Sequence, residues 1–220
     1  FGGEARWSEE ALRGSEVLRA SEGVAGDPER GIFRVWSTGS GTSMIFPENI
    51  DRDYDLDQYP LTDAARAAVA AFDQFADDPT NDCAPKGMPL VMEQPYPMEF
   101  VEQDGSILLR LEEYDTVRMI HMDEKSSLGT EPSPLGHSVG RWDGRDLIVT
   151  TTQIDSGTFD SVGIPLSEEA QLVEHFSPSA DGARLDYALT VTDPVNFTRP
   201  VELAKHWIHL PDVAVEPYEC

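Results

Sequence analysis

Apolar and polar residues alternate with the period of a β-strand from residue 98 onward. The alternation is strictest at Leu185, Tyr187, Leu189 and Val191. A period of two predicts strands that bury one face. Asp-Gly pairs favour tight hairpin turns, and they occur at Asp104-Gly105, Asp143-Gly144 and Asp181-Gly182. These patterns predict about eight short strands, over 98–103, 107–114, 117–122, 137–142, 146–154, 172–176, 185–191 and 201–209.

The chain before residue 98 contains one more predicted strand, over 31–36, and one predicted helix. Thr62 is a suitable N-cap for an Ala-rich helix over 64–76, which Asp77-Asp78-Pro79 ends. Apolar side chains lie at helical spacing in this segment and are expected to face the rest of the domain. They are Val69, Phe72 and Phe75.

Tight connections make consecutive strands antiparallel, and a sheet of this many strands curls, splits or closes. We therefore expect a mainly β fold, either an antiparallel curled sheet or a lipocalin-like up-and-down barrel, with the one Ala-rich helix outside it. A β-sandwich is the alternative. Residues 31–220 are interpreted as a single β-rich domain. Residues 1–30 are interpreted as an N-terminal arm or linker, because glycine and proline interrupt the helical pattern there.

Acidic residues outnumber basic ones by 41 to 16, which gives a formal net charge of −25. Such a field repels phosphate backbones and anionic lipid headgroups, so neither nucleic acid nor a membrane surface is an expected partner. The apolar runs are much shorter than the roughly 18–20 residues that a membrane-spanning helix needs. Cations, basic proteins and neutral small molecules remain compatible with this charge.

The chain contains two cysteines, Cys83 and the final residue Cys220. Chain ends usually fray, so a terminal cysteine favours a Cys83–Cys220 disulfide that fixes the C-terminus, with two free thiols as the alternative. Disulfides persist in oxidising compartments. Because the chain begins at Phe1 instead of Met, we expect a periplasmic or extracellular protein from which an export signal has been removed.

Several short motifs are similar to those of an uncharacterised family of exported bacterial proteins, of proteobacterial type, that ends in a cysteine. They are Leu61-Thr62, Asp77-Asp78-Pro79, Cys83, 85–89, 95–97, 120–123, the densest match at 133–142, and 217–220. The resemblance covers most of the chain from about Gly31 to Cys220. It implies export and the terminal disulfide, but it brings no activity and no catalytic residue to this chain.

One candidate metal site is the run of alternating aspartates Asp51, Asp53, Asp55 and Asp57. In an extended segment these four carboxylates share a face, and hard cations such as calcium prefer such oxygen ligands. The EF-hand pattern fails, however, because Leu56 occupies the position that needs glycine. An acidic, solvated loop is the alternative. Calcium is thus the one candidate cofactor.

A second candidate site combines histidines with carboxylates. If the apolar residues of 117–122 and 201–209 point into a barrel, His121 and His209 point inward with them, and Glu174 does so beside Leu172 and Phe176. His137 and Glu112 complete the candidate set. A histidine beside a carboxylate is a proton-transfer pair near neutral pH. The alternative is a set of hydrogen-bonded polar groups without chemistry.

Three functions fit these features. The first is an exported acidic β domain that binds a small apolar or amphipathic ligand in its interior. The second is an acid–base enzyme of the isomerase, hydratase or lyase type on the same scaffold. The third is an accessory subunit of an envelope or extracellular assembly, which contacts a protein partner through the N-terminal arm.

Overall fold

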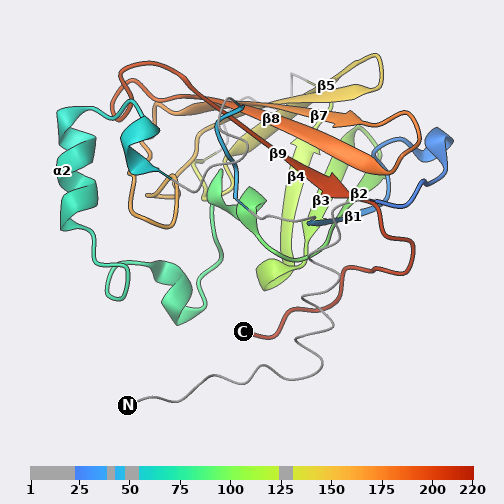
Figure 1. The fold of residues 1–220 in the computed structure, drawn as a ribbon, viewed down its shortest axis with the longest axis horizontal. Helices are drawn as coiled ribbons and strands as arrows, with labels where there is room; N and C mark the ends of the chain where they lie inside the picture. Colours follow the sequence, from blue (N-terminus) through green and yellow to red (C-terminus); the bar gives the residue numbers. More distant parts are fainter. Residues whose placement is uncertain (1–22, 39–42, 48–54, 124–130) are drawn as a thin grey trace.

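The computed structural model describes residues 23–38, 43–47, 55–123 and 131–220, and the account below concerns these residues. Nine strands among them form a closed barrel (Figure 1), which confirms the predicted barrel and excludes the sandwich. The strands are β1 (Val35–Thr38), β2 (Met98–Gln103), β3 (Ser106–Leu111), β4 (Thr116–His121), β5 (His137–Asp143), β6 (Asp146–Thr152), β7 (Gln171–Pro178), β8 (Arg184–Thr192) and β9 (Val201–Ile208). The helices are α2 (Asp63–Ala71) and the short 3-10 turns η1 (Pro28–Arg30), η3 (Leu56–Gln58), η4 (Pro79–Asp82), η5 (Leu90–Glu93) and η6 (Glu113–Asp115).

Neighbouring strands follow chain order around the barrel. The three Asp-Gly pairs lie in the predicted turns, and their glycines adopt positive φ values of 69°, 63° and 67°, a conformation that glycine adopts without a Cβ clash. Among the described strands, β4 and β5 are the one parallel pair of neighbours. Parallel neighbours need a long connection that brings the chain back to the same end of the sheet, and the connection between these two strands has that length. This seam is short: only Ile120 with Ser138 and His121 with Val139 are in register.

The barrel interior is filled by large side chains. Trp36, Trp207, Phe100 and Phe176 are fully buried, and the rings of Phe100 and Phe176 meet edge to face with their centroids 5.3 Å apart. Aromatic and branched residues from alternate positions of every long strand complete this core. The interior of a barrel of this size is ordinarily occupied by its own side chains.

Segments outside the sheet cover the two ends of the barrel (Figure 1). At one end Val24 N donates to His209 O at 2.8 Å and Gly26 N donates to Asp181 O at 3.0 Å, so residues 23–30, which lie in the predicted arm, pack on the barrel. At the other end lies α2, which Thr62 caps as predicted. The helix ends at Ala71, earlier than predicted, and Phe75 beyond it is 92% exposed instead of facing the domain.

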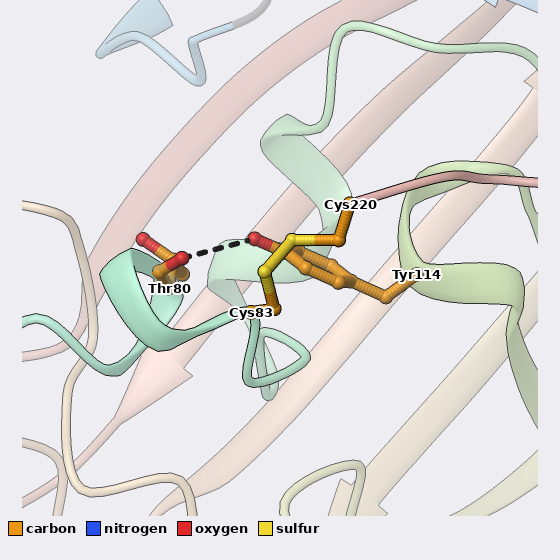
Figure 2. Close-up of a disulfide and its surroundings, with 4 residues drawn as sticks. All are labelled: Thr80, Cys83, Tyr114 and Cys220. Atoms are coloured by element: carbon orange, nitrogen blue, oxygen red, sulfur yellow. Dashed lines mark hydrogen bonds between the residues drawn. A yellow bond between two sulfur atoms is a disulfide. The ribbon is translucent and has the colours of Figure 1, made fainter.

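The Cys83–Cys220 disulfide forms as predicted, with a Cα–Cα distance of 6.0 Å. Figure 2 shows Tyr114 beside this bond, with its hydroxyl donating to Thr80 O at 3.4 Å. The ring of Tyr218 packs against Tyr114, with centroids 4.9 Å apart. The C-terminal tail is therefore fixed by an aromatic contact as well as by the covalent bond.

Candidate functional site

An arginine that the sequence interpretation did not select lies at the centre of the barrel. Arg118 of β4 is fully buried and donates to both carboxylate oxygens of Glu174 on β7, at 2.9 Å to Oε1 and at a shorter distance to Oε2. The same guanidinium donates to Ser138 Oγ at 3.0 Å and to Thr151 Oγ1 at 2.7 Å. Burial disfavours the positive charge of the guanidinium, but the charge and hydrogen bonds of Glu174 hold the pKa of Arg118 above its ordinary value.

Glu174 is in the interior, as its position beside Leu172 and Phe176 predicted. Its other neighbour is Tyr187, whose hydroxyl donates to Glu174 Oε1 at 2.9 Å. Burial, together with the charge of Glu174, raises the pKa of Tyr187 well above its ordinary value. All partners of Glu174 are thus buried groups of this network, and the structure places none of the predicted histidines in hydrogen-bond contact with it.

The face of β4 that points inward is the opposite of the one predicted. Val117 and Met119 are 51% and 47% exposed, whereas Thr116, Arg118 and Ile120 are buried. His121 therefore lies on the outside of the barrel with Val117 and Met119. The expected arrangement in which His121 and His209 share the interior does not form.

Lys205 of β9 and Glu93 of η5 are a second set of neighbouring ionisable groups. Lys205 is buried; its Nζ donates to Met92 O at 2.9 Å and lies 4.6 Å from the ring centroid of Trp207. Burial lowers the pKa of Lys205 to about 7, although the charge of Glu93 acts in the opposite direction. Burial also raises the pKa of Glu93, whose Oε1 accepts a hydrogen bond from Met44 N at 2.7 Å.

Two of the predicted site residues, His121 and His137, do come together. Their rings stack on the outer side of β4 and β5, with centroids 4.8 Å apart and planes 19° apart. Burial and the neighbouring His121 lower the pKa of His137. Nε2 of His137 is buried and has no hydrogen-bond partner in the described part of the chain, so at neutral pH this imidazole is uncharged.

The other two predicted residues lie elsewhere. His209 follows β9, where its ring meets that of Trp36 at 6.3 Å and its Nδ1 is 3.4 Å from Val35 O. Glu112 lies on the surface near the disulfide and accepts a hydrogen bond from Glu216 N at 2.9 Å. The candidate histidine–carboxylate set is therefore distributed over separate parts of the barrel.

A groove of about 820 Å³ runs along the outer side of β5 and β6, beside the end of β4. Its lining combines apolar with a few polar side chains: Met122, His137, Val139, Gly140, Arg141, Trp142, Ile148, Thr150 and Thr152. Trp142 is 44% exposed, and its ring meets that of Phe33 edge to face at 5.9 Å. A smaller cavity of about 220 Å³, with Lys86 and Asp160 in its wall, lies near η4 and η5.

The predicted calcium site lies only partly in the described chain. Asp51 and Asp53 are outside the described residues. Asp55 caps η3 by accepting a hydrogen bond from Asp57 N at 3.0 Å, and Asp57 lies 3.9 Å from Arg66. Within the described ranges, no three histidine, cysteine, aspartate or glutamate side chains form a group that fits a metal ion.

No family model matches the chain, and comparisons with curated proteins and with solved structures also give no match. The resemblance to exported bacterial proteins therefore stays a prediction. In the part of the chain that the structure describes, no helix has the length and apolar character needed to span a bilayer.

Proposed function

We propose that this protein is a binding domain and that its site is the groove along β5 and β6. The observation that carries this proposal is the groove itself. Its volume of about 820 Å³ falls within the range of roughly 300–1,000 Å³ that is typical of small-molecule sites. The proposed ligand is a small apolar or amphipathic molecule.

The lining supports an amphipathic ligand. Met122, Val139, Trp142 and Ile148 supply apolar contact area, and an indole that is half exposed offers a flat surface for a ring or chain. Thr150 and Thr152 supply hydroxyl groups on the same groove, and His137 also belongs to its lining. A few polar groups in an apolar lining orient a ligand.

The outer groove is a better place for the ligand than the interior. The interior contains two large tryptophans and the paired charges Arg118 and Glu174. Displacing an ion pair that is fully buried leaves uncompensated charges, so a ligand that entered the core would bind at a high cost. The Cys83–Cys220 bond supports a protein that works in an oxidising compartment, as the export prediction requires.

The proposal is tested with the uncharged fluorescent probe N-phenyl-1-naphthylamine. We expect binding to enhance probe emission and to quench Trp142. A Val139→Asp substitution places a charge in the groove lining and should weaken binding at least about tenfold, because burying an unpaired charge is unfavourable. The matched control is Val117→Asp, an exposed valine on β4 outside the lining. Equal probe affinity in the two variants would refute the groove as the site.

A second candidate is acid–base catalysis by the stacked pair. His137 belongs to the groove lining, and its buried Nε2 has no hydrogen-bond partner among the described residues. An uncharged imidazole of this kind is a suitable proton acceptor once a shift of the ring brings Nε2 to a bound substrate. If this function is right, turnover of a groove-bound substrate decreases as pH falls through the lowered pKa of His137 and is lost in His137→Gln. A His137→Gln protein with unchanged turnover would exclude it.

A further inference from the structure

The main chain of β5 has an open edge. Only Ser138 and Val139 of this strand are in register with β4, whereas pairing with β6 continues from His137 to Asp143. Residues 140–143 therefore extend past the end of β4. In the described ranges, no strand other than β6 pairs with these four residues.

This open edge can form further main-chain hydrogen bonds. Backbone N–H and C=O groups alternate sides along a strand, so half of those in residues 140–143 point away from β6. Exposed strand edges bind added strands readily. At about 3.4 Å per residue, this edge is about 14 Å long and fits roughly four residues of an added strand.

The groove borders this edge. Gly140, Arg141 and Trp142 belong to both the edge and the groove lining, and Met122 lines the groove where β4 ends. An added strand would thus form main-chain hydrogen bonds to β5 and place alternate side chains on Trp142 and Met122. This is the recognition mode in which backbone bonds supply affinity and neighbouring pockets supply specificity.

The charges near the edge favour a basic occupant. Arg141 is the cationic residue among the described lining residues, and the carboxylate of Asp143, 3.9 Å away on the surface, partly offsets its charge. Met122 N donates to Gly105 O at 3.0 Å, so these two residues are neighbours beside the edge. Asp123 follows Met122 in the chain and Asp104 precedes Gly105, and both aspartates are exposed. The whole chain carries −25, so a second copy is repelled whereas a cationic segment is attracted.

We propose that the open edge of β5 binds an extended, positively charged segment of another protein by strand addition. This inference rests on the proposed function, because it assigns a ligand class to the same groove. The segment carries apolar residues at alternate positions and lysine or arginine between them. One face of it contacts the groove, and its backbone continues the sheet beyond β4.

The test is selection of a phage-displayed library of random decapeptides on the full-length, disulfide-intact protein. We expect enriched sequences that alternate apolar with basic residues and that lose affinity for Val139→Lys but not for Val117→Lys, because only the first variant places a positive charge in the groove. N-methylation of an enriched peptide should weaken binding about tenfold at alternate positions and little between them, because each methyl group removes one backbone donor. Amide exchange at residues 140–143 should slow on binding.

Three outcomes would overturn the proposal. One is that no peptide is enriched on the native protein over the Val139→Lys variant. Another is an enriched peptide whose affinity does not depend on N-methylation, since side chains alone would then carry binding. The third is a dimer in sedimentation velocity that Val139→Asp dissociates, because the occupant would then be a second copy. If N-phenyl-1-naphthylamine still binds in any of these cases, the groove remains a small-molecule site and only strand addition fails.

Discussion

Replacing Glu174 by glutamine removes the only carboxylate that contacts Arg118 among the described residues, and it leaves the guanidinium buried without that counter-charge. The side chains of Arg118 and Glu174 are 1% and 0% exposed, so solvent cannot compensate the loss. Breaking such a buried pair typically costs about 3–5 kcal/mol. A domain of ordinary stability has only about 5–15 kcal/mol, so Glu174→Gln should lose a large part of the folding free energy.

The assay is equilibrium unfolding in urea at pH 7 without reductant, followed by tryptophan fluorescence. With an m-value of about 2–3 kcal/mol per molar urea, the expected loss lowers the midpoint by about 1–2 M. The double variant Arg118→Met/Glu174→Leu removes both charges and should recover at least half of the loss, since apolar replacement of a buried pair is often neutral or stabilising.

The matched control is Glu99→Gln, which breaks a surface pair with Arg110 at 2.9 Å whose side chains are 29% and 47% exposed. This change should cost less than about 1 kcal/mol. The reasoning is refuted if Glu174→Gln costs no more than the control. It is also refuted if the double variant is less stable than Glu174→Gln, because the cost would then come from lost packing and not from an unpaired charge.

Three further predictions concern other groups. Because the pKa of Lys205 is lowered to about 7, its contribution to stability is fully present above its unfolded pKa of about 10.5 and is lost as pH falls through 7. Relative to Lys205→Met, the unfolding free energy of the wild type should rise by about 5 kcal/mol in all as pH rises from below about 7 to above about 10.5, and parallel pH profiles would contradict this. Glu93, whose pKa burial raises, acts with the opposite sign, since its contribution is lost as pH rises through its folded pKa. Replacing Cys83 and Cys220 by serine should lower unfolding free energy by about 4–5 kcal/mol in the chain-entropy model and speed amide exchange at the C-terminus; unchanged stability in urea would show that the tail contributes little. Because burial lowers the pKa of His137, its NMR titration should have a midpoint below 6.5, and a midpoint above that value would show an exposed or ion-paired ring.

The barrel was predictable because its signals are local. Each Asp-Gly turn fixes where two strands meet, and alternation in 185–191 marks one buried face. The parallel placement of β5 beside β4 was not predictable, because it depends on where the long connection between them returns the chain. No turn motif encodes that return.

The inward face of β4 was predicted wrongly because its more apolar set is the exposed one. Alternation along a strand defines two faces of the strand. It does not show which of the two faces the interior when a charged residue is one of the buried ones. The missing signal lay on another strand. Glu174 was predicted correctly to point inward, and a buried carboxylate requires a cationic partner. Arg118 of β4 can be that partner only if its side of β4, and not the side of Val117 and Met119, faces the interior.

The groove could not be read from the sequence, although His137 is in its lining. The groove arises because β5 continues for four residues after its pairing with β4 has ended. Such an overhang depends on how the two strands are aligned in the folded sheet. Sequence alternation shows that a strand exists, whereas its unpaired remainder is a property of the assembled sheet.

The short seam between β4 and β5 divides the barrel into two mechanical units, a three-stranded sheet of β2–β4 and a five-stranded sheet of β5–β9. Only two residue pairs join these units directly at this seam. On the opposite side β1 joins them, with two pairs to β2 and two pairs to β9. Arg118 extends from the smaller sheet to Ser138, Thr151 and Glu174 of the larger one. A side chain thus supplements a short backbone ladder, and a contact between positions far apart in the chain helps to keep the two sheets closed into one cylinder.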